Sequence, residues 1–138
     1  MRLIGLDVGS KTIGVAISDA LGWTAQGLTT LHWDDNDIHS ADEDLAKIIK
    51  EHGVGKAIIG FPKNMNGTIG ERGEACIRFS DHVEKTHHIP TELWDERLTT
   101  MAAERVLLEA DMSRKKRKKV IDKMAATLIL QSYLDQNN

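Results

Sequence analysis

The stretch LIGLDVGSKTIGVAIS, residues 3–18, indicates the fold class. Its first six residues are almost all apolar, as expected of a central strand buried on both faces, and Asp7 interrupts them. A polar loop over 9–12 leads to a second predicted strand over 13–18, and a third is predicted over 24–33. Three strands in succession predict an antiparallel meander.

Helices and strands alternate after this meander. We expect a helix from Ser40 to just before Gly53, a strand over 56–61, a helix from Thr68 to about Lys85 and a strand over 92–96. The patterns SADE at Ser40 and TIGE at Thr68 predict capping boxes that open both helices. Further helices are predicted from about Thr99 and from Arg114 to about Leu134. The order βββαβαβαα predicts an α/β fold, with a mixed five-stranded sheet flanked by helices.

Length and composition favour one globular domain over residues 1–138. The chain is 41% hydrophobic and 28% charged, which is too apolar for a disordered protein. Cys76 is the only cysteine, so neither an intrachain disulfide nor a cysteine metal site can form, and we expect a reducing, cytoplasmic location. The apolar residues before Asp7 are too few for a signal segment or a membrane span, so we expect no membrane partner.

Three acidic residues lie at positions of the predicted fold that suggest a catalytic or metal-binding role. Asp7 interrupts a buried strand, where a carboxylate requires a metal ion, a cation or strong hydrogen bonds. Glu96 ends the fifth predicted strand, where open sheets place their sites, and Asp95 points to the opposite face. Asp122 shares the apolar stripe of the last helix with Ala125, Ala126 and Ile129.

Each of these acids also has a purely structural interpretation. Asp7 could cap the turn over 9–12, and Glu96 could form a surface salt bridge with Arg97 or Arg105. Asp122 could be the N-cap of a helix that starts at Lys123, although the apolar residues before it favour a helix that has already begun.

Together, the three carboxylates predict a metal-dependent phosphodiester hydrolase. Mg²⁺ and Mn²⁺ prefer oxygen ligands, and shared carboxylates can hold two such ions about 4 Å apart. No pair of histidines has the spacing of a zinc site, because His87 and His88 are adjacent. The other histidines are expected to be surface or packing residues; they are His32, His39, His52 and His82.

Four blocks of sequence resemble the signature blocks of the bacterial YqgF (RuvX) family. They are GLDVGSKTIGVAISD (5–19), GFPKNMNG (60–67), WDERLTT (94–100) and KVIDKMAA (119–126). The resemblance implies an RNase H-like fold and a nuclease that matures the 5′ end of pre-16S ribosomal RNA during ribosome biogenesis. Asp7, Glu96 and Asp122 match the acidic residues of the family.

The family is also described as Holliday-junction-resolvase-like, so a DNA endonuclease is the alternative activity. True RuvC-type resolvases carry an acid in the fourth strand and a second acid in the last helix. Here the segment AIIGFP, residues 57–62, contains no carboxylate, and Asp122 has no inward acidic neighbour.

Positive charge is concentrated in one segment. The six residues 114–119 are all cationic, in a chain whose net charge is −3. A charge run is usually a solvated helix face, but this one directly precedes a candidate metal ligand and therefore favours phosphate contacts. The loop over 63–68 could hold a phosphate or be a solvated turn. The predicted nucleic-acid contacts are Lys11, Lys63, Asn64, Arg97, Arg114, Lys115, Lys116, Arg117, Lys118 and Lys119.

The aromatic residues are scattered, so the sequence predicts structured or double-stranded nucleic acid, pre-ribosomal RNA above all, rather than a stacked single strand. Two other functions fit parts of the sequence. Residues 7–12 resemble the phosphate-1 loop of sugar kinases and actin-like ATPases, although those proteins close two such domains over ATP. A non-catalytic RNA-binding or assembly factor would keep the fold and the basic run without turnover.

Overall fold

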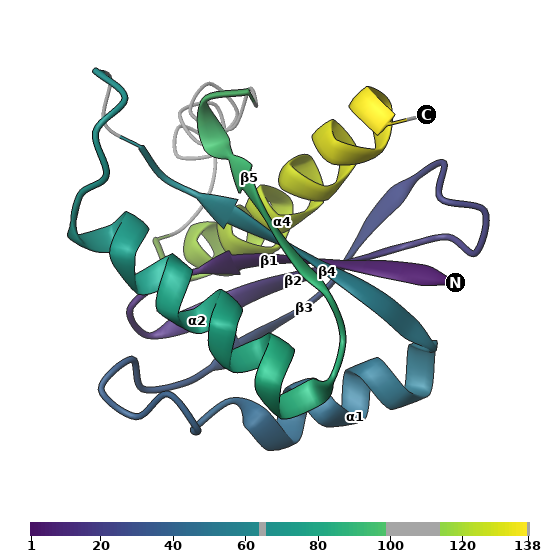
Figure 1. Ribbon diagram of the computed structural model, residues 1–138, viewed down its shortest axis with the longest axis horizontal. Coiled ribbons are helices and arrows are strands. Elements are labelled where there is room, and N and C mark those ends of the chain that lie inside the picture. Colours follow the sequence, from purple (N-terminus) through teal and green to yellow (C-terminus); the bar gives the residue numbers. More distant parts are fainter. Residues whose placement is uncertain (64–65, 99–113, 138) are drawn as a thin grey trace.

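A five-stranded mixed sheet forms the centre of the molecule (Figure 1). The computed structural model describes residues 1–63, 66–98 and 114–137, without the side chains of Leu98 and of residues 114–123. The strand order is β3-β2-β1-β4-β5, in which β1, β2 and β3 are antiparallel neighbours and β4 and β5 run parallel to β1. The predicted meander and mixed sheet are confirmed. The strands are β1 (Arg2–Val8), β2 (Thr12–Ser18), β3 (Ala25–His32), β4 (Val54–Phe61) and β5 (Thr91–Asp95).

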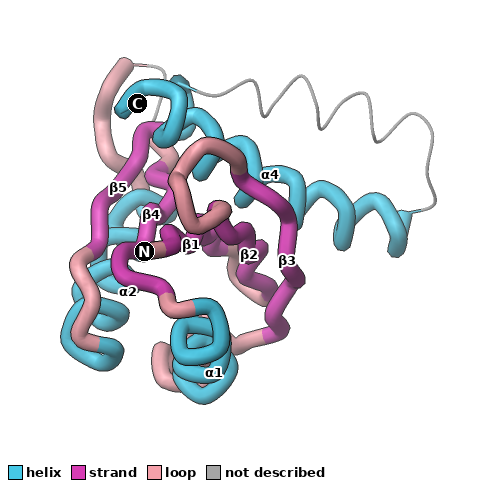
Figure 2. The backbone as a smooth tube through the Cα atoms, turned by 90° about the vertical axis from the view of Figure 1, so that its right-hand side faces the viewer, coloured by secondary structure: helices cyan, strands magenta, loops and turns pink. Residues whose placement is uncertain are grey.

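Helices cover both faces of this sheet (Figure 2). Helices α1 (Asp42–His52) and α2 (Glu71–His87) lie on one face, and α4 (Arg114–Asn137) crosses the other. A short 3₁₀ helix, η1 (Glu96–Leu98), follows β5 directly. The helix expected from Thr99 falls outside the described residues. In the described part of the chain, no helix has the length and apolar character needed to span a bilayer.

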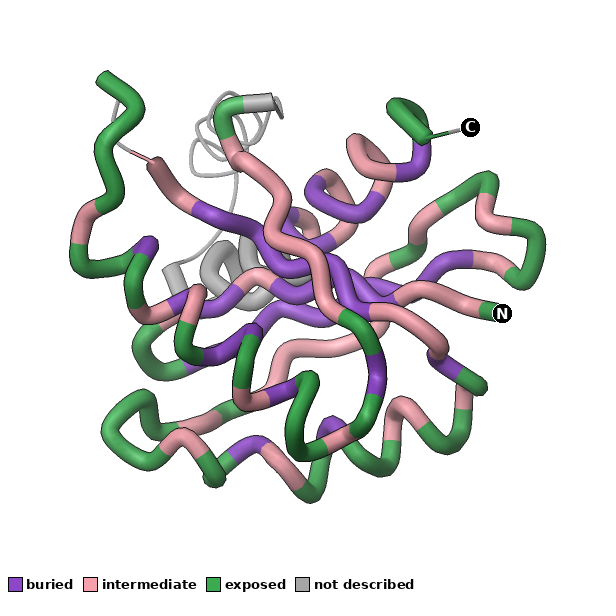
Figure 3. The backbone as a smooth tube through the Cα atoms, viewed as in Figure 1, coloured by how far each residue is buried: buried purple, intermediate pink, exposed green. Residues whose placement is uncertain are grey.

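The alternation of side chains along the strands creates two apolar cores. In β1, the side chains of Ile4, Leu6 and Val8 pack in the core beneath α1 and α2. The second core lies beneath α4, whose buried residues include Ile129 and Leu130. The central strands are buried along most of their length, whereas the outer surfaces of α1 and α2 are exposed (Figure 3). Successive residues on a strand therefore point their side chains to opposite faces of the sheet.

Neither predicted capping box forms. Helix α1 begins at Asp42 without a side-chain cap, because the Ser40 hydroxyl donates instead to the carbonyls of Asp34 and Asp37 in the preceding loop. Helix α2 begins at Glu71, and the Thr68 hydroxyl donates to the Asn66 side chain rather than capping the helix. The end of α1 is as predicted, since Gly53 takes a left-handed conformation with φ of 62°.

Candidate active site

Asp7 lies near the carboxyl end of β1 and faces α4. The orientation follows from Gly5, two residues earlier on the same face of the strand. A Cβ atom at Gly5 would lie 2.7 Å from the Leu130 Cβ and 3.0 Å from the Ala126 carbonyl, both in α4. The turn that follows β1 is closed by the backbone, because the Gly9 N–H donates to the Thr12 carbonyl over 2.8 Å.

Glu96 follows β5 and reaches the same face. Trp94, two residues earlier, donates from its indole N–H to the Ser132 hydroxyl of α4 over 3.1 Å. A Cβ atom at Gly60, the neighbour of Trp94 on β4, would lie 2.8 Å from the Glu96 Oε1 atom. The Glu96 carboxylate therefore lies over Gly60, in space that only a glycine leaves open.

Asp7 and Glu96 consequently approach Gly60 from the two neighbouring strands. β1 and β4 are parallel and Leu6 pairs with Ile59, so the next position along places Asp7 beside Gly60. The charges of both carboxylates also act on the Cys76 thiol, which lies in the core on the other face of the sheet. Burial, followed by the charges of Glu96 and Asp7, raises the pKa of Cys76 to about 11. The structure thus brings together two of the three predicted acids.

The third acid, Asp122, lies in α4 one turn before Ala126. Helix α4 runs opposite to β4, because Tyr133 contacts Lys56 near the start of that strand whereas Ile129 lies at Gly60. The turns of α4 that precede Ala126 therefore extend toward the carboxyl ends of β1 and β4. The Asp122 side chain falls outside the described part of the structure.

Asp95 points away from this group, as the sequence predicted, and pairs with Arg97. The Arg97 guanidinium donates to both oxygens of Asp95, with Nη2 2.8 Å from Oδ2 and Nε 3.2 Å from Oδ1. These hydrogen bonds lower the pKa of the Asp95 carboxyl. One of the predicted nucleic-acid contacts, Arg97, therefore has a carboxylate partner and remains exposed.

The remaining predicted contacts lie at the same end of the sheet or at the start of α4. Lys11 is exposed in the turn after β1, and the Lys63 ammonium lies 5.7 Å from the centre of the Phe61 ring, after β4. Asn64 is outside the described residues. The run 114–119 forms the first turns of α4, with side chains outside the described part.

Sequence reasoning missed Arg72, in the first turn of α2. Its guanidinium donates from Nη2 to the Val8 carbonyl at the end of β1. It also lines a cavity of about 220 Å³ together with Trp33 and Arg78. No motif in the sequence marks Arg72, because its importance comes only from the packing of α2 beside β1.

Two of the histidines expected to be surface or packing residues also contact a carboxylate in the structure. His39 and His82 both contact Asp42, and the ligand-type atoms of the three residues lie within 4.8 Å of one another. Spacing along the chain could not reveal this cluster, because His82 is 40 residues from Asp42.

The strand order and the helices on both faces define the class of RNase H-like folds. The fold matches that of Thermus thermophilus RuvC in complex with a Holliday junction substrate, with a TM-score of 0.62 at 10% identity, over 100% of this chain and 97% of that chain. It also matches the fowlpox virus resolvase in complex with Holliday junction DNA, with a TM-score of 0.60 at 13% identity, over 99% of both chains.

The chain belongs to the RuvX family. The family model described as "RuvX: Holliday junction resolvase" matches residues 1–136, which confirms the resemblance seen in the sequence blocks. A relative from Oceanobacillus iheyensis is 77% identical over 136 residues and 99% of both chains. Another from Bacillus subtilis is 56% identical over 138 residues and 100% of both chains. Both carry the name "Putative pre-16S rRNA nuclease".

Proposed function

We propose that this protein is a metal-dependent nuclease that processes the 5′ end of pre-16S ribosomal RNA, with Asp7, Glu96 and Asp122 as its catalytic carboxylates. The observation that carries the proposal is the approach of Asp7, near the end of β1, and Glu96, just after β5, to Gly60 on the strand between them. The names of the relatives support the choice of RNA.

The donors around Gly60 suit a hard divalent cation. Asp7 and Glu96 offer carboxylate oxygens, which Mg²⁺ and Mn²⁺ prefer. Cys76 is no competing ligand, because its side chain lies in the core on the opposite face of the sheet. Asp122 would complete the ligand set from α4. Ions held there would supply charge stabilisation to the attacking and leaving oxygens of a phosphodiester.

The cations around this end of the sheet would position the substrate. Lys11, Lys63 and Arg97 lie beyond the strand ends that carry the acids, and Asn64 follows Lys63 in the chain. The run 114–119 precedes Asp122 in α4, so phosphate contacts along it would direct a backbone toward the carboxylates. These residues are proposed to bind structured RNA, in the cytoplasm.

Cleavage of a pre-16S fragment by the purified chain with Mn²⁺ or Mg²⁺ tests the proposal. Asp7→Asn, Glu96→Gln and Asp122→Asn keep the shape of each side chain and remove its charge. Each should lower cleavage by about 100-fold or more, as expected when a group that stabilises transition-state charge is lost. The control is Asp44→Asn, which changes an exposed carboxylate of α1 and should leave cleavage intact.

A second candidate substrate is a four-way DNA junction, which the description of the matched family names. The same assay, with the junction as a competing substrate, separates the two. Faster turnover of the junction would favour the DNA endonuclease. Tight RNA binding without cleavage with either metal would contradict a nuclease and favour an RNA-binding factor.

A further inference from the structure

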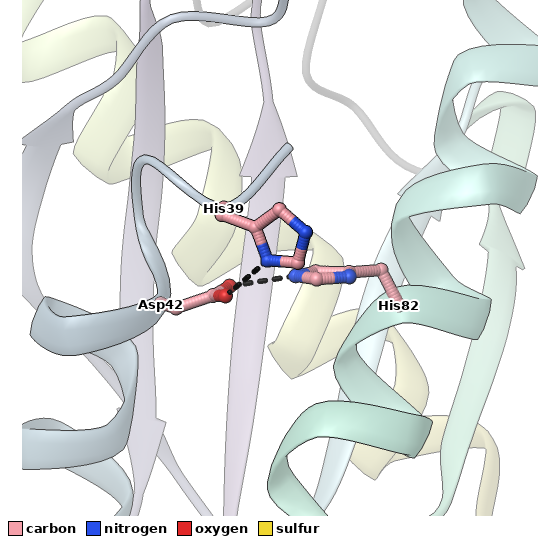
Figure 4. A group of neighbouring side chains, drawn as sticks. All are labelled: His39, Asp42 and His82. Carbon is pink, nitrogen blue, oxygen red and sulfur yellow. Dashed lines mark hydrogen bonds and ion pairs between the residues drawn. The ribbon is translucent and has the colours of Figure 1, made fainter. Parts of the chain in front are cut away.

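A second group of ligand-type side chains lies on the face of the sheet opposite α4. His39 comes from the loop before α1, Asp42 from the first turn of α1, and His82 from the middle of α2 (Figure 4). The His39 Nδ1 atom is 2.9 Å from Asp42 Oδ2, and the His82 Nε2 atom is 2.7 Å from Asp42 Oδ1. The two imidazole rings meet edge to face, with centroids 4.8 Å apart.

Two of these side chains are held in place by their surroundings. The side chains of His82 and Asp42 are only 12% and 24% exposed, whereas that of His39 is 73% exposed. The loop that carries His39 is fixed by Ser40, which bonds to Asp34 and Asp37, and by the His39 N–H, which donates to the Asp37 carboxylate. The cluster thus combines two anchored ligands with one that is open to solvent.

The donor set differs from the one around Gly60. Two imidazole nitrogens and one carboxylate oxygen are ligands that Zn²⁺ and related transition ions accept readily, with bonds of about 2.0–2.2 Å. Tetrahedral bonds of that length place neighbouring ligand atoms about 3–3.5 Å apart. The atoms here already lie within 4.8 Å of one another, and the exposed His39 ring can make the remaining movement.

We propose that His39, Asp42 and His82 form a Zn²⁺ site that links α1 to α2, separate from the carboxylate group beneath α4. His39 Nδ1, His82 Nε2 and one oxygen of Asp42 bind the ion, and water fills the fourth position at the solvent-exposed side of His39. With neutral imidazoles and one carboxylate, the site keeps a charge of +1 when loaded. The ion stabilises the docking of the two helices against each other and takes no part in phosphodiester chemistry.

The test is a titration of the EDTA-treated full chain with Zn²⁺ in excess Mg²⁺, which occupies oxygen-rich sites. We expect one equivalent of Zn²⁺ to bind with a dissociation constant in about the micromolar range, and the melting temperature to rise with zinc. Co²⁺ in place of Zn²⁺ should give the visible absorption bands of a four-coordinate nitrogen and oxygen site.

The variants His39→Ala, His82→Ala and Asp42→Asn should each weaken zinc binding by at least about tenfold, since even the loss of an outer hydrogen-bond partner costs that much. Asp42→Asn keeps the shape of the side chain, so it still tests the ligand role if an alanine variant fails to fold. His32→Ala removes an exposed histidine elsewhere and should bind zinc as the unmodified chain does.

Asp7→Asn should also leave zinc binding unchanged, which separates this site from the proposed catalytic carboxylates. Equal zinc affinity in the unmodified chain and in a His39→Ala, His82→Ala double variant would overturn the proposal. No binding at about 100 μM zinc, some two orders of magnitude above the expected range, would overturn it too. The cluster would then be a hydrogen-bonded link between the helices and nothing more.

Discussion

At the scale of single residues, Gly60 determines how much space the Glu96 carboxylate has. The nearest atoms that a Cβ atom there would meet belong to the side chains of Glu96 and Ile129. Glu96 is partly exposed and can move aside, whereas Ile129 is fully buried and must repack in the core beneath α4. A methyl group at Gly60 therefore displaces the carboxylate and also overpacks this core.

Gly60→Ala should reduce cleavage strongly and should also lower the free energy of unfolding by about 1–3 kcal/mol, the usual cost of overpacking a core. A misplacement of about 1 Å in a catalytic group can cost up to about 100-fold in rate. Steady-state kinetics and thermal melts of the same preparation measure both effects. The matched control is Gly55→Ala, on the same strand, where the added Cβ meets only the Met1 side chain. Equal losses in both variants would contradict a special role for Gly60.

The sequence predicted Asp7 and Glu96 because strand alternation is a local pattern. Asp7 interrupts an apolar run, and Glu96 stands at the end of one, so their faces follow from the sequence without tertiary structure. Arg72 and His82 could not be found in this way. Their partners, the Val8 carbonyl and Asp42, are distant in the chain and become neighbours only when α2 docks.

At the scale of elements, α4 lies against the sheet through Gly5. Here the added Cβ would meet the Cβ of Leu130 and the carbonyl of Ala126, atoms that belong to the helix backbone or lie next to it. Unlike the Glu96 side chain at Gly60, they cannot rotate away. The close approach of α4 to β1 thus depends on glycine.

Gly5→Ala should lower the free energy of unfolding by about 1–3 kcal/mol, the usual cost of overpacking. Urea denaturation measures this loss. Cleavage should fall as well, because the shift would move the turn that carries Asp122. Ordinary surface substitutions change stability by up to about 0.5 kcal/mol. A loss within that range would show that α4 can shift away from β1 at little cost.

The first turns of α4 should supply affinity for nucleic acid. Replacing Lys115, Lys116, Lys118 and Lys119 by Gln should weaken binding to all sequences alike, since phosphate contacts carry no sequence information. The slope of log affinity against log salt should also become shallower, by up to about 0.9 for each phosphate of a B-form duplex that the variant no longer neutralises. Fluorescence anisotropy over a salt series gives the slope. An unchanged slope would indicate an ordinary solvated helix face.

The sequence predicted the described helices, but it did not predict which interactions form where they begin. Ser40 and Thr68 have the right spacing to acidic residues for capping boxes, yet their hydroxyls bond to the preceding loops instead. Hydroxyl side chains bond to loop groups as readily as to a helix end, and local spacing cannot decide between them. Gly53 was predictable because its left-handed conformation suits glycine above other residues.

At the scale of the whole molecule, Cys76 couples stability to pH. It is only 1% exposed, and its pKa is raised from the ordinary 9.0 to about 11, chiefly by burial. The folded protein therefore holds the thiol neutral at a pH where the unfolded chain ionises it. This contribution to stability is complete below pH 9 and is lost as the pH rises through 11.

The Cys76→Ala variant should accordingly lose less stability than the unmodified protein between pH 9 and pH 11. The difference should grow by at most about 1.4 kcal/mol per pH unit, the free-energy equivalent of one proton per molecule. Urea midpoints at several pH values measure it. Because every other group is common to both proteins, only the difference is diagnostic, and parallel curves would contradict the raised pKa of Cys76.

The place of α4 in the chain has a consequence for the order of events during translation. Every strand of the sheet precedes α4, so a ribosome synthesises Asp7, Gly60 and Glu96 before the helix that carries Asp122. Until α4 emerges, the apolar face with Ala16 and Ile58 is exposed, so that chaperones can bind it or the chain can aggregate through it. With the proposed catalytic role of Asp122, a nascent chain would lack nuclease activity until the docking of α4 covers the second core.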